Sequence, residues 1–224
     1  MAFLNTEDIG ACKLLNDNYN IIRDEYESFK TNYLYNSDRD ELDEDDSSSW
    51  GLWLKGNRES VDAAKRLEEY EELSWDEHTI EPIRKRSNWY SLTVDDTDIW
   101  EGILLGSRSK PPMYPFENSI LGTTYFPETM ALLGSYTDNV IMSATIAVFP
   151  ANKIIPRHNG YATLTRIHLP LYVPDGDIAF CVGEETRSWE VGQCLAFNDI
   201  DDHNAWNNTD EDRVVLIVDI RKRS

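Results

Sequence analysis

The sequence predicts an α+β fold, with helices first and a core of short β-strands packed as a jelly-roll or sandwich. Three observations support this prediction. The chain has 224 residues, which is enough for one sizeable core and favours a single domain over 1–224. Apolar side chains recur at helical spacing near the N-terminus, whereas from Asn139 onward apolar segments of strand length alternate with turn residues. Helices followed by many short strands are typical of α+β proteins.

The N-terminal region, residues 1–84, is predicted to be helical. Its first 35 residues carry one apolar stripe at three- and four-residue spacing, formed by Leu15, Tyr19, Ile22, Tyr26, Phe29 and Tyr33. A second helix is expected over 59–73, with Val61, Ala64, Leu67 and Leu73 as its buried positions. Between the two, residues 37–49 hold seven acidic residues against one arginine. Because like charges repel and nothing apolar is present to bury, we expect a surface loop there, with a functional acidic tether as the alternative.

The core, residues 85–224, is predicted to be built mainly from strands. After Pro82 the sequence changes to short segments separated by turn residues. Strands are expected near 140–149, 162–173, 177–183, 193–198 and 213–220. Turns are expected at 174–177 and 191–192, where proline, aspartate and glycine interrupt the apolar pattern.

Composition and charge exclude several classes of protein. The chain is 41% hydrophobic and 11% aromatic, which is typical of globular rather than disordered proteins. Its net charge of −20 argues against nucleic acid and anionic membranes as partners. Neither a run of about 18 apolar residues nor a signal-peptide pattern is present. The three cysteines, Cys12, Cys181 and Cys194, lack metal-binding spacing and are typical of reduced thiols, so a cytoplasmic protein is expected.

Three of the four histidines fall within one window, residues 158–203. Neutral imidazole is a good ligand for divalent iron, and strands hold it rigidly. His158 follows a short strand-like stretch, and His203 is expected in a polar loop after the strand near 193–198. The usual non-haem iron triad adds a carboxylate two residues after the first histidine. Here that residue is Gly160, so two histidines alone would hold the metal, leaving an extra position for water, substrate or halide.

Two arginines accompany these histidines. Arg213 opens an apolar run, where an arginine needs an anionic partner, and a carboxylate matches its planar fork. Arg166 and His168 differ by two, so in a strand their side chains point to the same face. Together these groups could hold both ends of a small dicarboxylate. Each also has an ordinary explanation: a structural histidine, or an ion pair between Arg213 and Asp210 or Asp212.

At these residues the chain resembles the aspartyl/asparaginyl β-hydroxylase family of iron- and 2-oxoglutarate-dependent oxygenases. The likeness is carried, in the family's order and spacing, by His158–Gly160, Arg166–Pro174, Trp189–Gly192, Phe197–Asp199, His203–Asn207 and Arg213–Ile220. Weaker similarities at 18–25 and 126–129 extend it over most of the chain. The resemblance implies a double-stranded β-helix core, the jelly-roll of cupin-like proteins, with N-terminal helices.

Carried over residue by residue, the resemblance implies that His158 and His203 bind iron. Arg213 would bind the distal carboxylate of 2-oxoglutarate, and Arg166 and His168 would contact its keto-acid end.

Two further features follow from the same resemblance. The family often has a serine where this chain has Ile146, so the neighbouring Thr145 is the candidate for a hydroxyl contact with the cosubstrate. Trp189 and Trp206 are expected to pack around the site.

The activity implied by the resemblance is hydroxylation that uses Fe(II), 2-oxoglutarate and O2. The expected target is an unactivated carbon, the β-carbon of an amino acid or of an aspartyl/asparaginyl-type residue, free, in a peptide or tethered to a carrier. Two alternatives stay open. Glycine in place of the carboxylate ligand is also how iron halogenases admit chloride. A non-catalytic jelly-roll could bind a small acid or a carbohydrate through Arg213 and the histidines.

Overall fold

The computed structural model describes residues 2–31, 101–107, 116–118, 120–159 and 164–222. The expected helix over 59–73 and the expected acidic loop over 37–49 lie outside these residues. Where the chain is described, the N-terminal stripe is helical as predicted, and it buries Leu15, Ile22, Tyr26 and Phe29. It forms two helices rather than one, because the backbone leaves helical geometry at Asn18.

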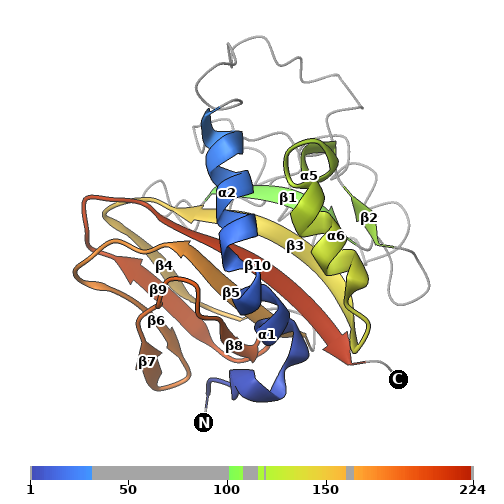
Figure 1. Cartoon of the computed structure of the whole chain (residues 1–224). Helices are drawn as coiled ribbons and strands as arrows, with labels where there is room; N and C mark the ends of the chain where they lie inside the picture. The colour runs from blue at the N-terminus through green and yellow to red at the C-terminus, as the bar shows by residue number, and fades with distance from the viewer. Residues whose placement is uncertain (1, 32–100, 108–115, 119, 160–163, 223–224) are drawn as a thin grey trace, which may run out of the picture.

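Helices cover one face of the larger sheet (Figure 1). They follow a short 3-10 turn, Thr6–Asp8, and are α1 (Gly10–Asp17), α2 (Tyr19–Phe29), α5 (Ile120–Tyr125) and α6 (Pro127–Ser135). None of the helices in the described part of the chain is long and apolar enough to cross a membrane.

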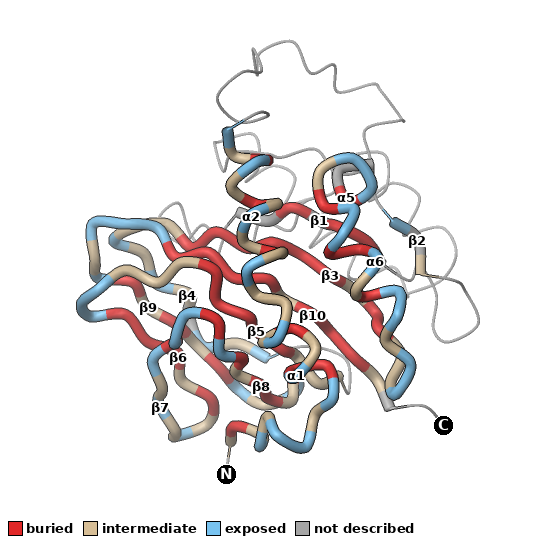
Figure 2. Tube along the Cα trace, viewed as in Figure 1, coloured by how far each residue is buried: buried red, intermediate tan, exposed pale blue. Residues whose placement is uncertain are grey.

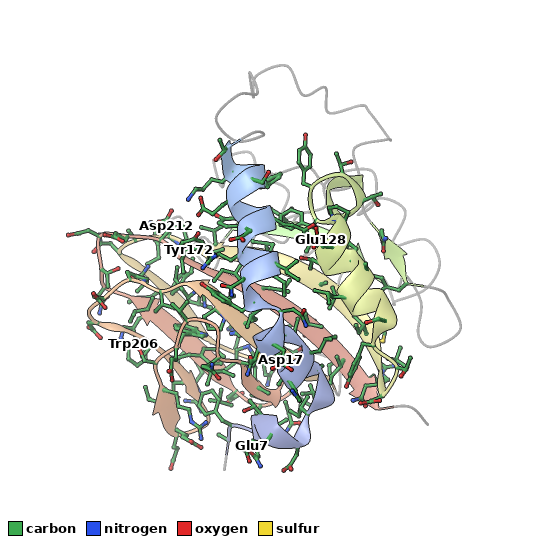
Figure 3. All side chains as sticks on the ribbon, viewed as in Figure 1. Glu7, Asp17, Glu128, Tyr172, Trp206 and Asp212 are labelled. Carbon is green, nitrogen blue, oxygen red and sulfur yellow. The ribbon has the colours of Figure 1, made fainter. Side chains whose placement is uncertain are left out.

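Polar contacts fix α2 in place. The Glu25 carboxylate accepts hydrogen bonds from the backbone N–H groups of Glu128 and Thr129 and from the Thr129 hydroxyl, at 2.8, 2.9 and 2.6 Å. It therefore caps the first turn of α6, where negative charge is favourable. The Tyr172 hydroxyl donates to the Glu27 carboxylate and ties α2 to the sheet (Figure 3).

The strands of the described residues form two antiparallel sheets. The larger has the order β2-β1-β3-β10-β5-β8, with bounds β1 (Glu101–Ser107), β2 (Glu117–Asn118), β3 (Asn139–Phe149), β5 (Thr165–Tyr172), β8 (Leu195–Asn198) and β10 (Arg213–Lys222). The smaller has the order β4-β9-β6-β7, with bounds β4 (Lys153–His158), β6 (Ile178–Val182), β7 (Glu185–Arg187) and β9 (His203–Asn207). From β3 onward the chain passes repeatedly between the two sheets, which is the jelly-roll, or double-stranded β-helix, arrangement. The predicted fold class is confirmed.

Side chains of the larger sheet alternate between two environments, as the pleat requires. One face packs against the helices and contains Ala144, Ile146, Val148, Ile167, Leu169, Val214, Leu216 and Val218. The other face meets the smaller sheet and contributes Ala147, Phe149, Phe197 and Val215 to a second apolar cluster. Figure 2 shows that β3, β10 and β5 are largely buried between these layers. The alternation sends the positions of Arg213, Arg166 and His168 into the space between the sheets.

Candidate metal and carboxylate site

Buried polar side chains concentrate between the two sheets. They are Thr145, His168, Asp199, His203, Asn207, Arg213 and Asp219. Because a buried polar or charged group is costly without a partner, such a concentration inside an apolar core is a candidate binding site.

His158 and His203 are brought directly opposite each other. They are paired residues on the neighbouring strands β4 and β9, and their ring centroids lie 4.2 Å apart. The Nδ1 atom of His203 lies 2.7 Å from the carbonyl oxygen of Asp201. A carbonyl oxygen only accepts, so Nδ1 carries the proton and Nε2 keeps a lone pair for a metal. Burial lowers the pKa of His203 to about 4, so the ring is neutral near pH 7, as a ligand must be.

The expectation that His203 lies in a loop is wrong. A turn between Asn198 and Asp201 already reverses the chain, through a 3.0 Å backbone hydrogen bond. The following residues join β9, which pairs with both β4 and β6. The polar sequence resembles a loop, but pairing on both sides decides its structure.

Arg213 is a buried cation without a charged partner among the described residues. Its side chain is 3% exposed, and its guanidinium lies 4.4 Å from the ring centroid of Trp189 and 5.1 Å from that of Phe149. Its Nε atom has no hydrogen-bond partner. Burial lowers the pKa of Arg213 to about 9. A buried cation needs an anion, and the two aromatic rings occupy no hydrogen-bonding position that a carboxylate would use.

The ordinary explanation for Arg213 is wrong. Asp210 accepts a hydrogen bond from the Asn152 side chain at 3.3 Å, and Asp212 accepts one from the backbone of Ala151 at 2.9 Å. Both contacts stabilise the turn that leads into β10, where Figure 3 places Asp212. Neither acid neutralises the arginine.

Arg166 is engaged by two carboxylates. It lies opposite Asp219 across β5 and β10 and binds it through two parallel contacts, Nε to Oδ1 at 2.8 Å and Nη2 to Oδ2 at 3.0 Å. Its Nη1 atom lies 2.6 Å from Oδ1 of Asp199. The proposed contact between Arg166 and a keto acid therefore stays a prediction, and the structure shows the arginine in an ion-pair network.

His168 lies deeper, in an aromatic pocket. Its ring centroid is 5.2 Å from that of Phe180 and 5.4 Å from that of Phe197, and its Nδ1 atom accepts a 3.3 Å hydrogen bond from Nε1 of Trp189. Burial, followed by the nearby Arg213 and Arg166, lowers the pKa of His168 well below its ordinary value. The ring is therefore neutral and acts as a hydrogen-bonding group.

The structure does not bring Thr145 beside Arg213. Thr145 is buried on β3 opposite Ile217, whereas Arg213 is opposite Phe149. Four residues of strand separate the two, roughly 13 Å. Ala147, not a hydroxyl-bearing residue, holds the intervening position on that face.

Sequence reasoning missed two acids and misplaced one tryptophan. Asp199 and Asp219 are both buried, and Asp219 also accepts a 2.9 Å hydrogen bond from Ser143. An acid directly after a buried strand, as at Asp199, was the available signal. Trp206 donates to Asp177 at 2.7 Å, on the alternate face from the buried Ala205. It therefore lies outside the site, whereas Trp189 packs into it.

The residues present fit a metal with two protein ligands. No group of three or more His, Cys, Asp or Glu side chains suited to a metal occurs in the described ranges, so His158 and His203 would be its only ligands from those residues. A dicarboxylate could complete the coordination and reach Arg213.

Comparisons with known proteins show the family to which the chain belongs. A family model described as aspartyl/asparaginyl β-hydroxylase matches residues 16–223. The chain belongs to this family of hydroxylases.

Three curated relatives illustrate the similarity. The ornithine lipid ester-linked acyl 2-hydroxylase of Rhizobium tropici is 39% identical over 85 residues, covering 37% of this chain and 30% of the relative. The aspartate β-hydroxylase domain-containing protein 2 of Homo sapiens is 36% identical over 102 residues, covering 42% of this chain and 27% of the relative. The aspartyl/asparaginyl β-hydroxylase of Homo sapiens is 26% identical over 141 residues, covering 62% of this chain and 17% of the relative. The chain thus spans less than a third of each relative.

A solved 2OG-Fe(II) oxygenase family protein from Burkholderia pseudomallei superposes with a TM-score of 0.45 at 14% identity, over 66% of this chain and 81% of that one.

Proposed function

We propose that this protein is an Fe(II)- and 2-oxoglutarate-dependent hydroxylase. The proposed target is an unactivated carbon, the β-carbon of an amino acid or of an aspartyl/asparaginyl-type residue, free, in a peptide or on a carrier. The observation that carries the proposal is the buried guanidinium of Arg213, unpaired among the described residues, in the same interior as the paired rings of His158 and His203. The choice of β-carbon is supported by the family.

Each residue has a definite task in this proposal. The imidazoles of His158 and His203 hold the iron at the end of β4 and the start of β9. Bound iron together with 2-oxoglutarate supplies the activation of O2. Arg213 binds the far carboxylate of the cosubstrate and thereby fixes its orientation. Phe180 and Phe197 pack against the ring of His203 and exclude water, which strengthens every charge interaction in the site.

A coupled-turnover experiment tests the proposal. The protein is incubated with Fe(II), 2-oxoglutarate and O2 and a panel of aspartyl, asparaginyl and free amino-acid substrates, with an acyl-amino-acid lipid included. We expect succinate to form in step with a product that has gained one oxygen atom derived from O2. Omission of 2-oxoglutarate is the control and should stop product formation.

Two results would contradict hydroxylation. A product whose mass shows chlorine in place of hydrogen, dependent on added chloride, identifies a halogenase. Failure to bind Fe(II) and 2-oxoglutarate at all leaves the non-catalytic small-acid-binding jelly-roll.

A further inference from the structure

Among the described residues, Trp189 contacts two buried groups that the proposed function connects with the cosubstrate, the guanidinium of Arg213 and the imidazole of His168. It lies between β7 and β8, immediately before a turn closed by a 3.0 Å hydrogen bond from Gln193 N to Glu190 O, and a second 3.0 Å bond from Gly192 N to Pro170 O fastens that turn to β5. Its side chain is buried. The backbone around it is thus anchored at two points, so the indole is presented at a fixed place.

The indole contacts Arg213 and His168 through different parts of its ring. Its face lies 4.4 Å below the guanidinium carbon of Arg213, where the negative face of the π-system attracts the cation. Its Nε1–H donates to Nδ1 of His168 at 3.3 Å, and the two rings are nearly parallel at 17°. One side chain therefore restrains a cation and a neutral imidazole together.

The hydrogen bond fixes the proton position on His168. An indole N–H only donates, so Nδ1 must be unprotonated. The ring is neutral, so its one proton is on Nε2. His168 is thereby a hydrogen-bond donor at Nε2, the atom on the far side of the ring from Trp189. With the proton on Nδ1 instead, Nε2 would present a lone pair and repel a carboxylate.

We infer that Trp189 is a positioning residue for the carboxylate pocket. It holds the Arg213 guanidinium by its face and keeps Nε2–H of His168 available as a donor, so that a dicarboxylate meets a cation and a neutral donor at fixed places. The identity of that dicarboxylate as 2-oxoglutarate rests on the proposed function. Simple packing does not account for the contacts of Trp189 with Arg213 and His168. An apolar ring of similar size would provide neither the N–H donor nor the stronger π-face of indole.

Two measurements on the metal-free protein test the inference, and neither depends on turnover. Nitrogen-15 NMR of histidine-labelled protein reports which ring nitrogen of each of the four histidines carries the proton, and His168→Gln identifies the signals of His168. Calorimetry with 2-oxoglutarate gives the dissociation constant. We expect the Nε2–H form of His168 in the wild type. In Trp189→Phe we expect a tautomer mixture and a dissociation constant about 10- to 100-fold higher.

Trp206→Phe is the matched control. It removes an indole of the same kind, but that indole is bound to Asp177 outside the site, so both readouts should stay at wild-type values. A wild-type His168 that carries its proton on Nδ1 would overturn the inference without any variant, even if Trp189→Phe failed to fold. Unchanged tautomer and affinity in a folded Trp189→Phe would also overturn it while leaving the proposed function intact. If the wild type binds no 2-oxoglutarate even with Fe(II) present, the proposed function fails and the assigned ligand fails with it.

Discussion

Replacing His158 or His203 by alanine lowers the affinity of the protein for Fe(II) by more than about 100-fold, because loss of a second-shell partner alone typically costs 10- to 100-fold. Because His158 and His203 are the two proposed protein ligands among the described residues, each variant keeps one of them. We expect both variants to remain folded, since the cost of burying the neutral ring of His203 disappears with it. Turnover at limiting iron should fall in parallel with the affinity.

The measurement is an anaerobic binding titration with Fe(II), accompanied by circular dichroism to verify the fold. His168→Gln is the matched control, because it also changes a buried histidine of the same interior but not a proposed ligand. It should retain wild-type iron affinity. If either His158→Ala or His203→Ala bound iron as the wild type does, the assignment of these two ligands would be wrong.

Arg213→Met should separate stability from ligand binding, with effects of opposite sign. Without ligand, the free energy of unfolding should stay the same or rise by up to about 4 kcal/mol. The reason is that an apolar side chain of similar length replaces a buried cation that has no carboxylate partner in the described structure. The dissociation constant for 2-oxoglutarate should rise at least about 30-fold, because the carboxylate loses its cation. Denaturant titration and calorimetry measure the two quantities.

Arg166→Met is the comparison that makes this result specific. Arg166 has two buried carboxylate partners, Asp199 and Asp219. Its removal leaves both charges uncompensated and should lower the free energy of unfolding by about 3 kcal/mol. If Arg213→Met destabilised the protein as Arg166→Met does, Arg213 would be part of a structural ion pair rather than a ligand site.

Much of this architecture can be derived from local sequence patterns. The spacing of Leu15, Ile22 and Phe29 defines a buried helical face. The strict alternation along β10 places Arg213 on the opposite face from Leu216 and Val218, which pack against the helices. These features depend on residues close in the sequence, so periodicity alone reveals them.

What could not be derived depends on pairing between distant segments. His203 was expected in a loop, yet it joins a strand because β4 and β6 flank it. Asp210 and Asp212, close to Arg213 in sequence, bind the turn instead, and Arg166 finds its partners at Asp219 and Asp199. Sequence proximity misled here because β register, not chain separation, decides which charges meet.

The residues expected around the cosubstrate also depend on pairing between distant segments. Ile146 stands where the family often has serine, which makes its neighbour Thr145 the candidate hydroxyl, but β register separates Thr145 from Arg213. Trp189 and Trp206 looked equivalent in the sequence, yet only Trp189 is turned inward. The distinction between them lies in the β7–β8 connection, whose path no local pattern fixes.

If this interior binds Fe(II) and 2-oxoglutarate together, anaerobic titration of the protein with both should produce a weak visible charge-transfer band. We expect the band to require iron and the keto acid at once and to be lost in His203→Ala. A wild-type protein that binds neither component, or binds iron without the band at saturating 2-oxoglutarate, would show that this interior is not an Fe(II) and 2-oxoglutarate site.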